Sequence, residues 1–122
     1  MITPFGKELR KARVDLDMAQ ADMAKTIGVS PAYLSAVETG KRKATYALCE
    51  RIGRLTKDKA LEVKLKNLVS LESGMVPIHN LEQAQKALVL KICSVKMEGT
   101  FIANVLKMIQ SYEALHSNPK QV

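Results

Sequence analysis

The polar side chains best placed for chemistry in this chain gather in one stretch, residues 20–43. The stretch ends in three consecutive cations, Lys41, Arg42 and Lys43. Before them it carries an amide, two hydroxyls and a phenol, on Gln20, Ser30, Ser35 and Tyr33. Such groups contact the phosphate oxygens and base edges of nucleic acids. This stretch is therefore the candidate functional segment.

Enzyme chemistry finds no support in the sequence. There is no candidate Ser-His-Asp set, no Gly-rich phosphate loop and no cluster with metal-ligand spacing, so we expect no catalytic residues, no metal and no cofactor. Cys49 and Cys93 lie far apart in apolar helical patterns. This favours two buried reduced thiols, with a disulfide or a metal site as the alternative. His79 has no partner at ligand spacing and is expected to be exposed.

The first half of the candidate segment is expected to form a helix that begins at Gln20. Its apolar residues Met23, Ala24 and Ile27 are spaced so that they line one helical face. Gly28 follows them directly. Glycine most easily adopts the positive φ with which helices end, so Gly28 is expected to end this helix.

A second helix is expected over Ser30 to Thr39. The Ser30 hydroxyl suits its N-cap, and a proline such as Pro31 suits a first turn, where a missing N–H costs nothing. Leu34 and Val37 are three residues apart and must face the core. The side chains left on the outer face are Pro31, Ala32, Tyr33, Ser35 and Ala36.

The stretch matches a known pattern at Gln20, Ala24, Gly28, Val29, Ser30, Tyr33, Ser35, Glu38 and Gly40, with Met23 and Ile27 in place of leucines. It resembles the helix-turn-helix of the Cro/Xre family of DNA-binding regulators. The matches are in the family's order and include the turn glycine, the cap and the closing Glu-x-Gly. The resemblance covers roughly the first 55 to 70 residues.

The resemblance implies a role for several of these residues. Gln20 would contact a phosphate with its amide, helped by the helix N-terminus. Glu38 would be structural, paired with a nearby Arg or a backbone N–H. The second helix would lie in a major groove about 12 Å wide, which its length of roughly 15 Å allows. Lys41, Arg42 and Lys43 would contact the flanking phosphates, or else form a solvated charge run.

The outer face of the second helix is poor in groups that read bases, because it carries no Arg, Asn or Gln. Ser35 remains as a donor or acceptor, and Ala32 and Ala36 suit thymine methyl groups. Tyr33 suits a phosphate or a base edge, or packs against the first helix. Specificity per contact would then be modest, and it would be supplemented either by Lys41, Arg42 or an N-terminal residue, or by DNA shape.

The composition fits a small all-helical domain with an anionic partner. Apolar residues make up 47% of the 122 residues and aromatic residues only 4%, so aliphatic side chains must fill the core. The net charge is +7. Residues 1–66 hold 14 Lys and Arg against 8 Asp and Glu, whereas residues 67–122 hold 5 against 4. The positive charge therefore lies with the helix-turn-helix half.

Three further helices complete a five-helix domain of the lambda-repressor kind over residues 1–72, as periodicity and the resemblance both suggest. The first is expected near residues 4–15, capped at Thr3, with Phe5, Leu9, Ala12 and Leu16 as its apolar stripe. Its basic residues Lys7, Arg10, Lys11 and Arg13 would touch phosphates in the family, or are simply solvated. The others follow Thr45 and Lys57, with apolar stripes Leu48, Cys49, Ile52, Leu55 and Leu61, Leu65, Leu68, Leu71.

Residues 73–122 are expected to form a C-terminal helical hairpin with a disordered polar tail after Leu115. One helix would run from Leu81 to Met97, capped at Asn80, and the next would be capped at Thr100. The apolar stripes exceed what a hairpin of about 35 residues can bury within itself. They pack on the first domain or, as the family's dimers suggest, on a second copy. The expected dimer contacts are Phe101, Val105, Ile109 and Tyr112.

The resemblance implies a sequence-specific transcription regulator, a repressor that binds an inverted repeat of double-stranded DNA as a homodimer. The alternative is the DNA-binding antitoxin of a toxin–antitoxin pair, in which residues 73–122 would hold a toxin. No apolar run approaches 18 residues and no long apolar segment opens the chain, so we expect a cytoplasmic protein without a membrane partner.

Overall fold

The computed structural model describes residues 1–116, and every regular element there is a helix. The elements are α1 (Pro4–Asp15), α2 (Gln20–Ile27), α3 (Pro31–Glu38), α4 (Tyr46–Thr56), α5 (Lys59–Ser73), α6 (Gln83–Ser94) and α7 (Gly99–His116). The predicted fold class is confirmed: all-α, with a helix-turn-helix near the N-terminus and two helices after the fifth. The tail expected to be disordered lies outside the described residues, except for His116, which is helical.

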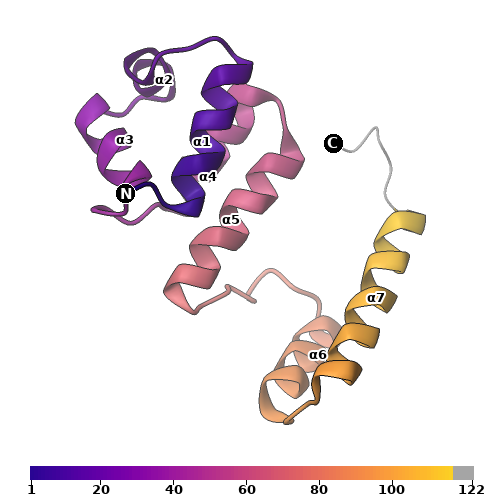
Figure 1. Cartoon of the computed structure of the whole chain (residues 1–122). Helices are drawn as coiled ribbons and strands as arrows, with labels where there is room; N and C mark the ends of the chain where they lie inside the picture. The colour runs from indigo at the N-terminus through magenta and orange to yellow at the C-terminus, as the bar shows by residue number, and fades with distance from the viewer. Residues whose placement is uncertain (117–122) are drawn as a thin grey trace. The chain divides into compact units, whose positions relative to one another are not determined.

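The chain divides into two compact units, Met1–Met75 and Val76–Val122. The first holds α1 to α5, and the second holds α6 and α7 (Figure 1). Each unit is described by itself below.

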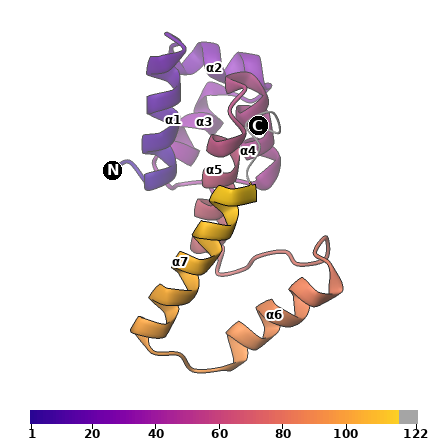
Figure 2. The ribbon, with the colours of Figure 1, turned by 90° about the vertical axis from the view of Figure 1, so that its right-hand side faces the viewer.

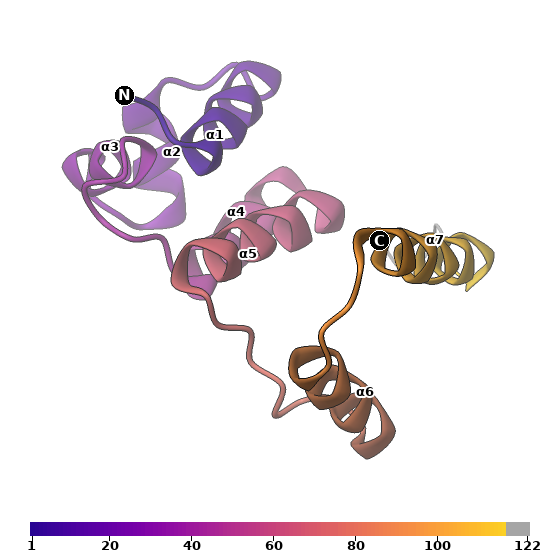
Figure 3. The ribbon, with the colours of Figure 1, turned by 60° about the horizontal axis from the view of Figure 1, so that its bottom comes forward.

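In the first unit, α1 packs against α3 and α5, α2 packs against α3 and α4, and α4 packs against α5 (Figures 1 and 3). The buried apolar residues are Phe5, Leu9, Ala12, Met23, Ala24, Ile27, Leu34, Val37, Leu48, Cys49, Ile52 and Leu65. Most of them are aliphatic, as the composition requires. They come from all five helices, so the helix-turn-helix shares one core with α1, α4 and α5.

Two members of the predicted apolar stripes in the first unit neither belong to this core nor pack against it. Leu16 is 37% exposed because α1 ends at Asp15, and Leu16 serves as its C-cap rather than continuing the stripe. Leu71 is 79% exposed because it lies in the last turns of α5, beyond the partly buried Val69. Periodicity predicts which side of a helix is apolar, but not how far along that helix its neighbours reach.

The two cysteines lie in different environments. Cys49 is fully buried in the core, as predicted, whereas Cys93 is exposed on α6, so the expectation of burial was wrong for Cys93. Burial raises the pKa of the Cys49 thiol to about 11, so it stays protonated at neutral pH. Cys49 therefore behaves as a small apolar core residue.

The N-terminus of α1 is hydrogen-bonded to the C-terminus of α3 and packs closely against it. The backbone N–H and the hydroxyl of Thr3 both donate to the Glu38 carbonyl oxygen, at 3.0 and 3.1 Å. Gly6 lies against the same carbonyl: a Cβ built on Gly6 would be 2.3 Å from that oxygen. Only glycine lets the two helices approach this closely.

Gly6→Ala is therefore expected to lower the free energy of unfolding by about 2 kcal/mol, because backbone atoms must move apart to admit the methyl group. Urea unfolding of the two proteins would measure the loss. Gly99→Ala is the matched control, since a Cβ there meets nothing within 4 Å. Equal stability of Gly6→Ala and the unmutated chain would contradict the described contact.

The helices α4 and α5 also approach each other closely, and the Glu62 carboxylate lies at their contact. A Cβ on Gly53 would be 2.5 Å from Oε1 of Glu62, which is 7% exposed. The Lys59 ammonium donates to Oε2 of Glu62 at 2.9 Å, and that of Lys66 lies 3.2 Å from the same oxygen. The hydrogen bond from Lys59 is the largest of the effects that lower the pKa of Glu62.

Glu62 should make the free energy of unfolding depend on pH in the acidic range. Because its pKa is lowered on folding, Glu62 stabilises the fold fully above its unfolded pKa of about 4.3, and this is lost as pH falls through the folded pKa. The difference in unfolding free energy between the chain and its Glu62→Gln variant should shrink from pH 6 to pH 3 (roughly). Urea unfolding at each pH measures it, and all other carboxylates cancel in the difference. A constant difference over this range would contradict the assignment.

The second unit differs in detail from the predicted hairpin. A hydrogen bond from the Leu81 N–H to the Ile78 carbonyl, at 3.0 Å, closes a turn before α6, so Asn80 is not its cap and α6 begins only after Glu82. Thr100 is not a cap either, because α7 already begins at Gly99. Figure 2 shows α6 and α7 diverging from the short connection between them. His79 is exposed, as predicted.

Neither α6 nor α7 contains a buried residue. Ten large apolar side chains on them are at least 42% exposed: Leu88, Leu90, Ile92, Phe101, Ile102, Leu106, Met108, Ile109, Tyr112 and Leu115. No helix within residues 1–116 is both long and apolar enough to cross a lipid bilayer.

Candidate DNA-binding surface

The helix α3 is fixed in place by its first residues and by its inner face. The Ser30 hydroxyl accepts a hydrogen bond from the Tyr33 N–H at 3.0 Å, and Pro31 occupies the first turn. Leu34 and Val37 are 0% and 2% exposed and anchor the helix in the core. The helix therefore begins and faces inward as the sequence predicts.

The outer face of α3 is open to solvent. Ala32 and Ser35 are exposed, and Tyr33 and Ala36 are half-buried. The Ser35 side chain makes no hydrogen bond within residues 1–116, and its backbone carbonyl accepts from the N–H and the hydroxyl of Thr39 at 3.2 and 3.0 Å. The side chains expected to meet DNA bases thus lie on one accessible face, with Tyr33 also packed against the core.

The turn between α2 and α3 is set by Gly28 and by an arginine from α4. Gly28 has a φ of 82°, the left-handed conformation that ends a helix. The Arg51 guanidinium donates to the Ile27 carbonyl oxygen at 3.1 Å, so a carbonyl left free at the end of α2 is satisfied. Arg51 is a contact that the sequence analysis missed, because nothing in the local pattern of α4 points to α2.

A buried carboxylate joins three helices behind this surface. Glu38, at the end of α3, is 2% exposed and pairs with the Arg13 guanidinium of α1. The Gln20 amide, at the start of α2, donates to Oε2 of Glu38 at 2.7 Å. The structural role expected for Glu38, with an arginine partner, agrees with this geometry.

Arg13 corrects the prediction for the basic face of α1. The side chain of Arg13 is only 14% exposed and faces Glu38, so it is neither solvated nor directed at phosphates. Burial, and then the charge of Arg10, lower the pKa of Arg13, but a guanidinium stays charged at neutral pH. Lys7, Arg10 and Lys11 remain exposed on α1.

Gln20 begins α2, and one donor of its side-chain amide is already committed to Glu38. An amide group carries two N–H donors, so the second is available to a ligand. Because Arg13 balances the Glu38 charge, the carboxylate behind Gln20 is not an uncompensated negative charge facing DNA. The phosphate contact of Gln20 stays a prediction.

The basic loop after α3 is folded back onto the end of the helix. The N–H groups of Lys41 and Arg42 donate to the Ala36 carbonyl, at 2.8 and 3.2 Å. Gly40 makes this possible with a φ of 82°. The side chains of Lys41, Arg42 and Lys43 are all exposed. Three cations thus lie at the exit of α3.

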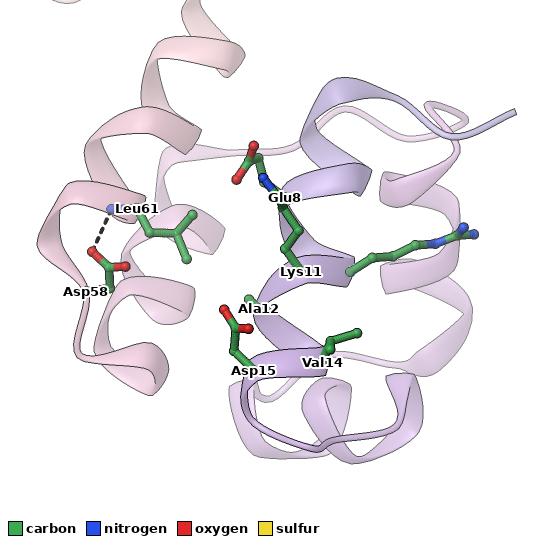
Figure 4. A pocket seen from close by; sticks show the side chains of 8 residues that line it. Glu8, Lys11, Ala12, Val14, Asp15, Asp58 and Leu61 are labelled. Carbon is green, nitrogen blue, oxygen red and sulfur yellow. Dashed lines mark hydrogen bonds between the residues drawn. The ribbon is translucent and has the colours of Figure 1, made fainter.

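A separate pocket of about 470 Å³ lies between α1 and α5 (Figure 4). Three acidic and two basic side chains are among its lining residues, and two of the acids already have partners in the structure. Asp58 caps α5 by accepting from the Leu61 N–H at 3.0 Å, and Glu8 pairs with Lys64 at 3.0 Å. Residues 1–116 also hold no group of three or more His, Cys, Asp or Glu able to bind a metal ion.

In the second unit, the predicted dimer residues fall into two pairs. Val105 and Ile109 line an open apolar pocket of about 300 Å³. Its other walls are Ile92, Val95, Met97, Ile102 and Leu106. Phe101 and Tyr112 lie outside it, 56% and 64% exposed. The Tyr112 ring instead stacks on His116, with centroids 3.9 Å apart.

A capped helix with a buried inner face, an open outer face and cations at its exit defines a helix-turn-helix DNA-binding domain. Residues 9–57 match the family described as Helix-turn-helix. They span all of α2, α3 and α4 and more than half of α1. The predicted resemblance to the Cro/Xre-type helix-turn-helix is confirmed for this part of the chain.

The chain is also similar to an uncharacterized HTH-type transcriptional regulator of Archaeoglobus fulgidus. The two are 28% identical over 117 residues, which make up 92% of this chain and 51% of that relative. The chain thus spans about half the length of this relative. No solved structure matches the chain.

Proposed function

We propose that this chain is a sequence-specific transcription regulator that inserts α3 into the major groove of duplex DNA. The observation that carries the proposal is the outer face of α3, where Ala32 and Ser35 are exposed beside the cations of residues 41–43. The similarity to an HTH-type transcriptional regulator of Archaeoglobus fulgidus supports a regulatory role. Repression by occupying a promoter, in the cytoplasm, is part of the proposal.

The way this surface reads DNA follows from its chemistry. Ser35 offers a hydroxyl to base edges, and Ala32 and Ala36 offer methyl groups to thymine. Gln20 and the cations of residues 41–43 contact phosphates, which sets the position of α3 but carries little sequence information. Each base contact is therefore weak, and the shape of the site adds to specificity.

We further propose that the chain binds as a homodimer through α6 and α7. Two copies of α3 would then enter successive major grooves about 34 Å apart on an inverted repeat. The large apolar side chains exposed on α6 and α7 support this, since two helices without a buried residue gain stability by packing on a partner. Phe101, Val105, Ile109 and Tyr112 contribute to that interface.

The direct test is selection of bound sequences from random duplex DNA by the purified chain. The proposal expects one enriched motif made of two inverted half-sites, with centres 10 to 10.5 base pairs apart or a multiple of this (about one turn). No enrichment over bulk DNA would refute sequence-specific binding. A single half-site without symmetry would refute the homodimer alone.

The dimer itself is testable by sedimentation of the DNA-free chain. Ile109→Asp should convert a dimer into a monomer, because it buries a charge in the apolar surface. Gln110→Asp is the matched control: Gln110 is exposed, does not line the pocket and lies on the opposite side of α7 from the predicted contacts, so its variant should stay dimeric. A monomeric unmutated chain would contradict the dimer.

The same apolar surface favours a second candidate, a DNA-binding antitoxin in which α6 and α7 hold a toxin. The two candidates differ in what occupies the surface, not in how α3 binds DNA. A monomeric chain that co-purifies from its own cells with one small toxic protein, and loses it on Ile109→Asp, would favour the antitoxin.

A further inference from the structure

The three cations after α3 are not equivalent, because one of them is held against an aromatic ring. The guanidinium of Arg42 lies over the ring of Tyr33, with Cζ 5.5 Å from the ring centroid. A cation at this distance over a ring face is attracted by the ring's quadrupole. The described part of the chain shows no such contact, and no ion pair, for Lys41 or Lys43.

The ring that Arg42 lies on is itself fixed. Tyr33 is in the first turn of α3, and its N–H is bound by the Ser30 hydroxyl at 3.0 Å. Its side chain is half-buried and packs against the core cluster. The Tyr33 side chain is thus held by the core, and the Arg42 guanidinium lies over its ring.

The main chain of Arg42 is fixed as well. Its N–H donates to the Ala36 carbonyl at 3.2 Å, in the loop that begins at Gly40. Arg42 is therefore held at both its backbone and its guanidinium, whereas an exposed cation held only by its backbone must be ordered when it binds. A guanidinium that lies over a ring keeps N–H donors free for hydrogen bonds to a phosphate.

We propose that Tyr33 is a positioning residue whose ring holds the Arg42 guanidinium ready for a DNA phosphate, and that Tyr33 makes no essential DNA contact through its hydroxyl. The ligand is a backbone phosphate at the rim of the groove that α3 enters. This rests on the proposed DNA binding and refines it: one of the three cations binds preorganised, through a partner on the recognition helix.

The test measures dissociation constants for the selected duplex over a range of salt concentrations. Arg42→Ala should weaken binding about tenfold and lower the salt slope by about 0.9, the value for one phosphate contact. Tyr33→Phe keeps the ring face and should bind within about twofold of the unmutated chain. Tyr33→Leu keeps apolar bulk without a ring, and should weaken binding about three- to fivefold while leaving the slope nearly unchanged.

A double-mutant cycle separates positioning from independent contacts. In the Arg42→Ala background, Tyr33→Leu should cost almost nothing, because the group it positions is gone. Lys43→Ala is the control, and its cost should be the same in the Tyr33→Leu background as in the unmutated chain. Thermal unfolding of each variant checks that it is folded at the temperature of the assay.

Three results would overturn the inference. If Tyr33→Phe binds as weakly as Tyr33→Leu, the hydroxyl is the DNA contact. If the costs of Tyr33→Leu and Arg42→Ala multiply, the two residues act independently. If the unmutated chain prefers no duplex, the proposed function fails and this inference fails with it, whereas the first two results leave the proposed function standing.

Discussion

Replacing Glu38 with alanine is expected to lower the free energy of unfolding by about 3 to 5 kcal/mol. Glu38 is 2% exposed and holds Arg13 of α1 and Gln20 of α2, so its loss leaves a largely buried guanidinium without a counter-charge. Removing one partner of a buried pair costs more than the pair itself contributes, because the remaining charge stays desolvated. Urea unfolding of the variant measures the loss.

Two variants test whether the loss of stability arises because the Arg13 charge is left buried without a partner. Glu38→Gln keeps the shape and an acceptor for Gln20, and should be less damaging than Glu38→Ala. Arg13→Met combined with Glu38→Leu removes both charges, and should recover much of the stability that Glu38→Ala loses. A Glu38→Ala variant within about 0.5 kcal/mol of the unmutated chain, as for an ordinary surface change, would show that the pair does not hold the three helices together.

Placing a carboxylate on the outer face of α3 is expected to abolish DNA binding without unfolding the chain. Ser35 is exposed and its side chain makes no hydrogen bond to any of residues 1–116, so Ser35→Glu fits sterically and suits a helix. Facing the phosphates across the groove, the new charge should weaken binding by at least about 100-fold, since like charges brought together cost several kcal/mol. Fluorescence anisotropy with the selected duplex measures this.

The matched control is Asn67→Glu, which makes the same change of charge at an exposed position on α5. A charge away from the contact surface is screened over about 10 Å at 0.1 M salt, so binding should change by less than about threefold. Equal losses in the two variants would mean that total charge, rather than the face of α3, governs binding.

Local signals made the helix-turn-helix predictable from the sequence. Gly28, Ser30 and Pro31 mark the turn and the start of α3, and the structure shows the turn and cap expected of them. The inner positions Leu34 and Val37 followed from spacing alone. Each of these features depends on neighbours within four residues, and such neighbours are visible in the sequence.

Contacts between distant residues were not predictable in the same way. Arg13 looked like one more exposed cation, because its partner Glu38 lies 25 positions further along the chain. The contacts of Arg51 with Ile27 and of Arg42 with Tyr33 were missed because the same kind of side chain serves equally well in solvent. A cationic side chain shows its role only once the fold brings its partner to it.

Apolar periodicity was least informative in the second unit. It predicted helices there, but not where they start. A turn over Ile78–Leu81 delays the start of α6, and α7 starts at Gly99, before the expected cap Thr100. It also placed Cys93 in a buried position, although Cys93 is exposed. An apolar face indicates that a helix needs a partner, and burial requires that partner to be present.

The most direct test of the account is methylation of guanine N7, an atom in the major groove, on the selected duplex with and without the chain. The account predicts protection of guanines within each half-site, lost on Ser35→Glu and retained on Asn67→Glu. Unchanged guanine N7 reactivity across a bound duplex, with protection confined to the minor-groove N3 of adenine, would contradict insertion of α3 into the major groove.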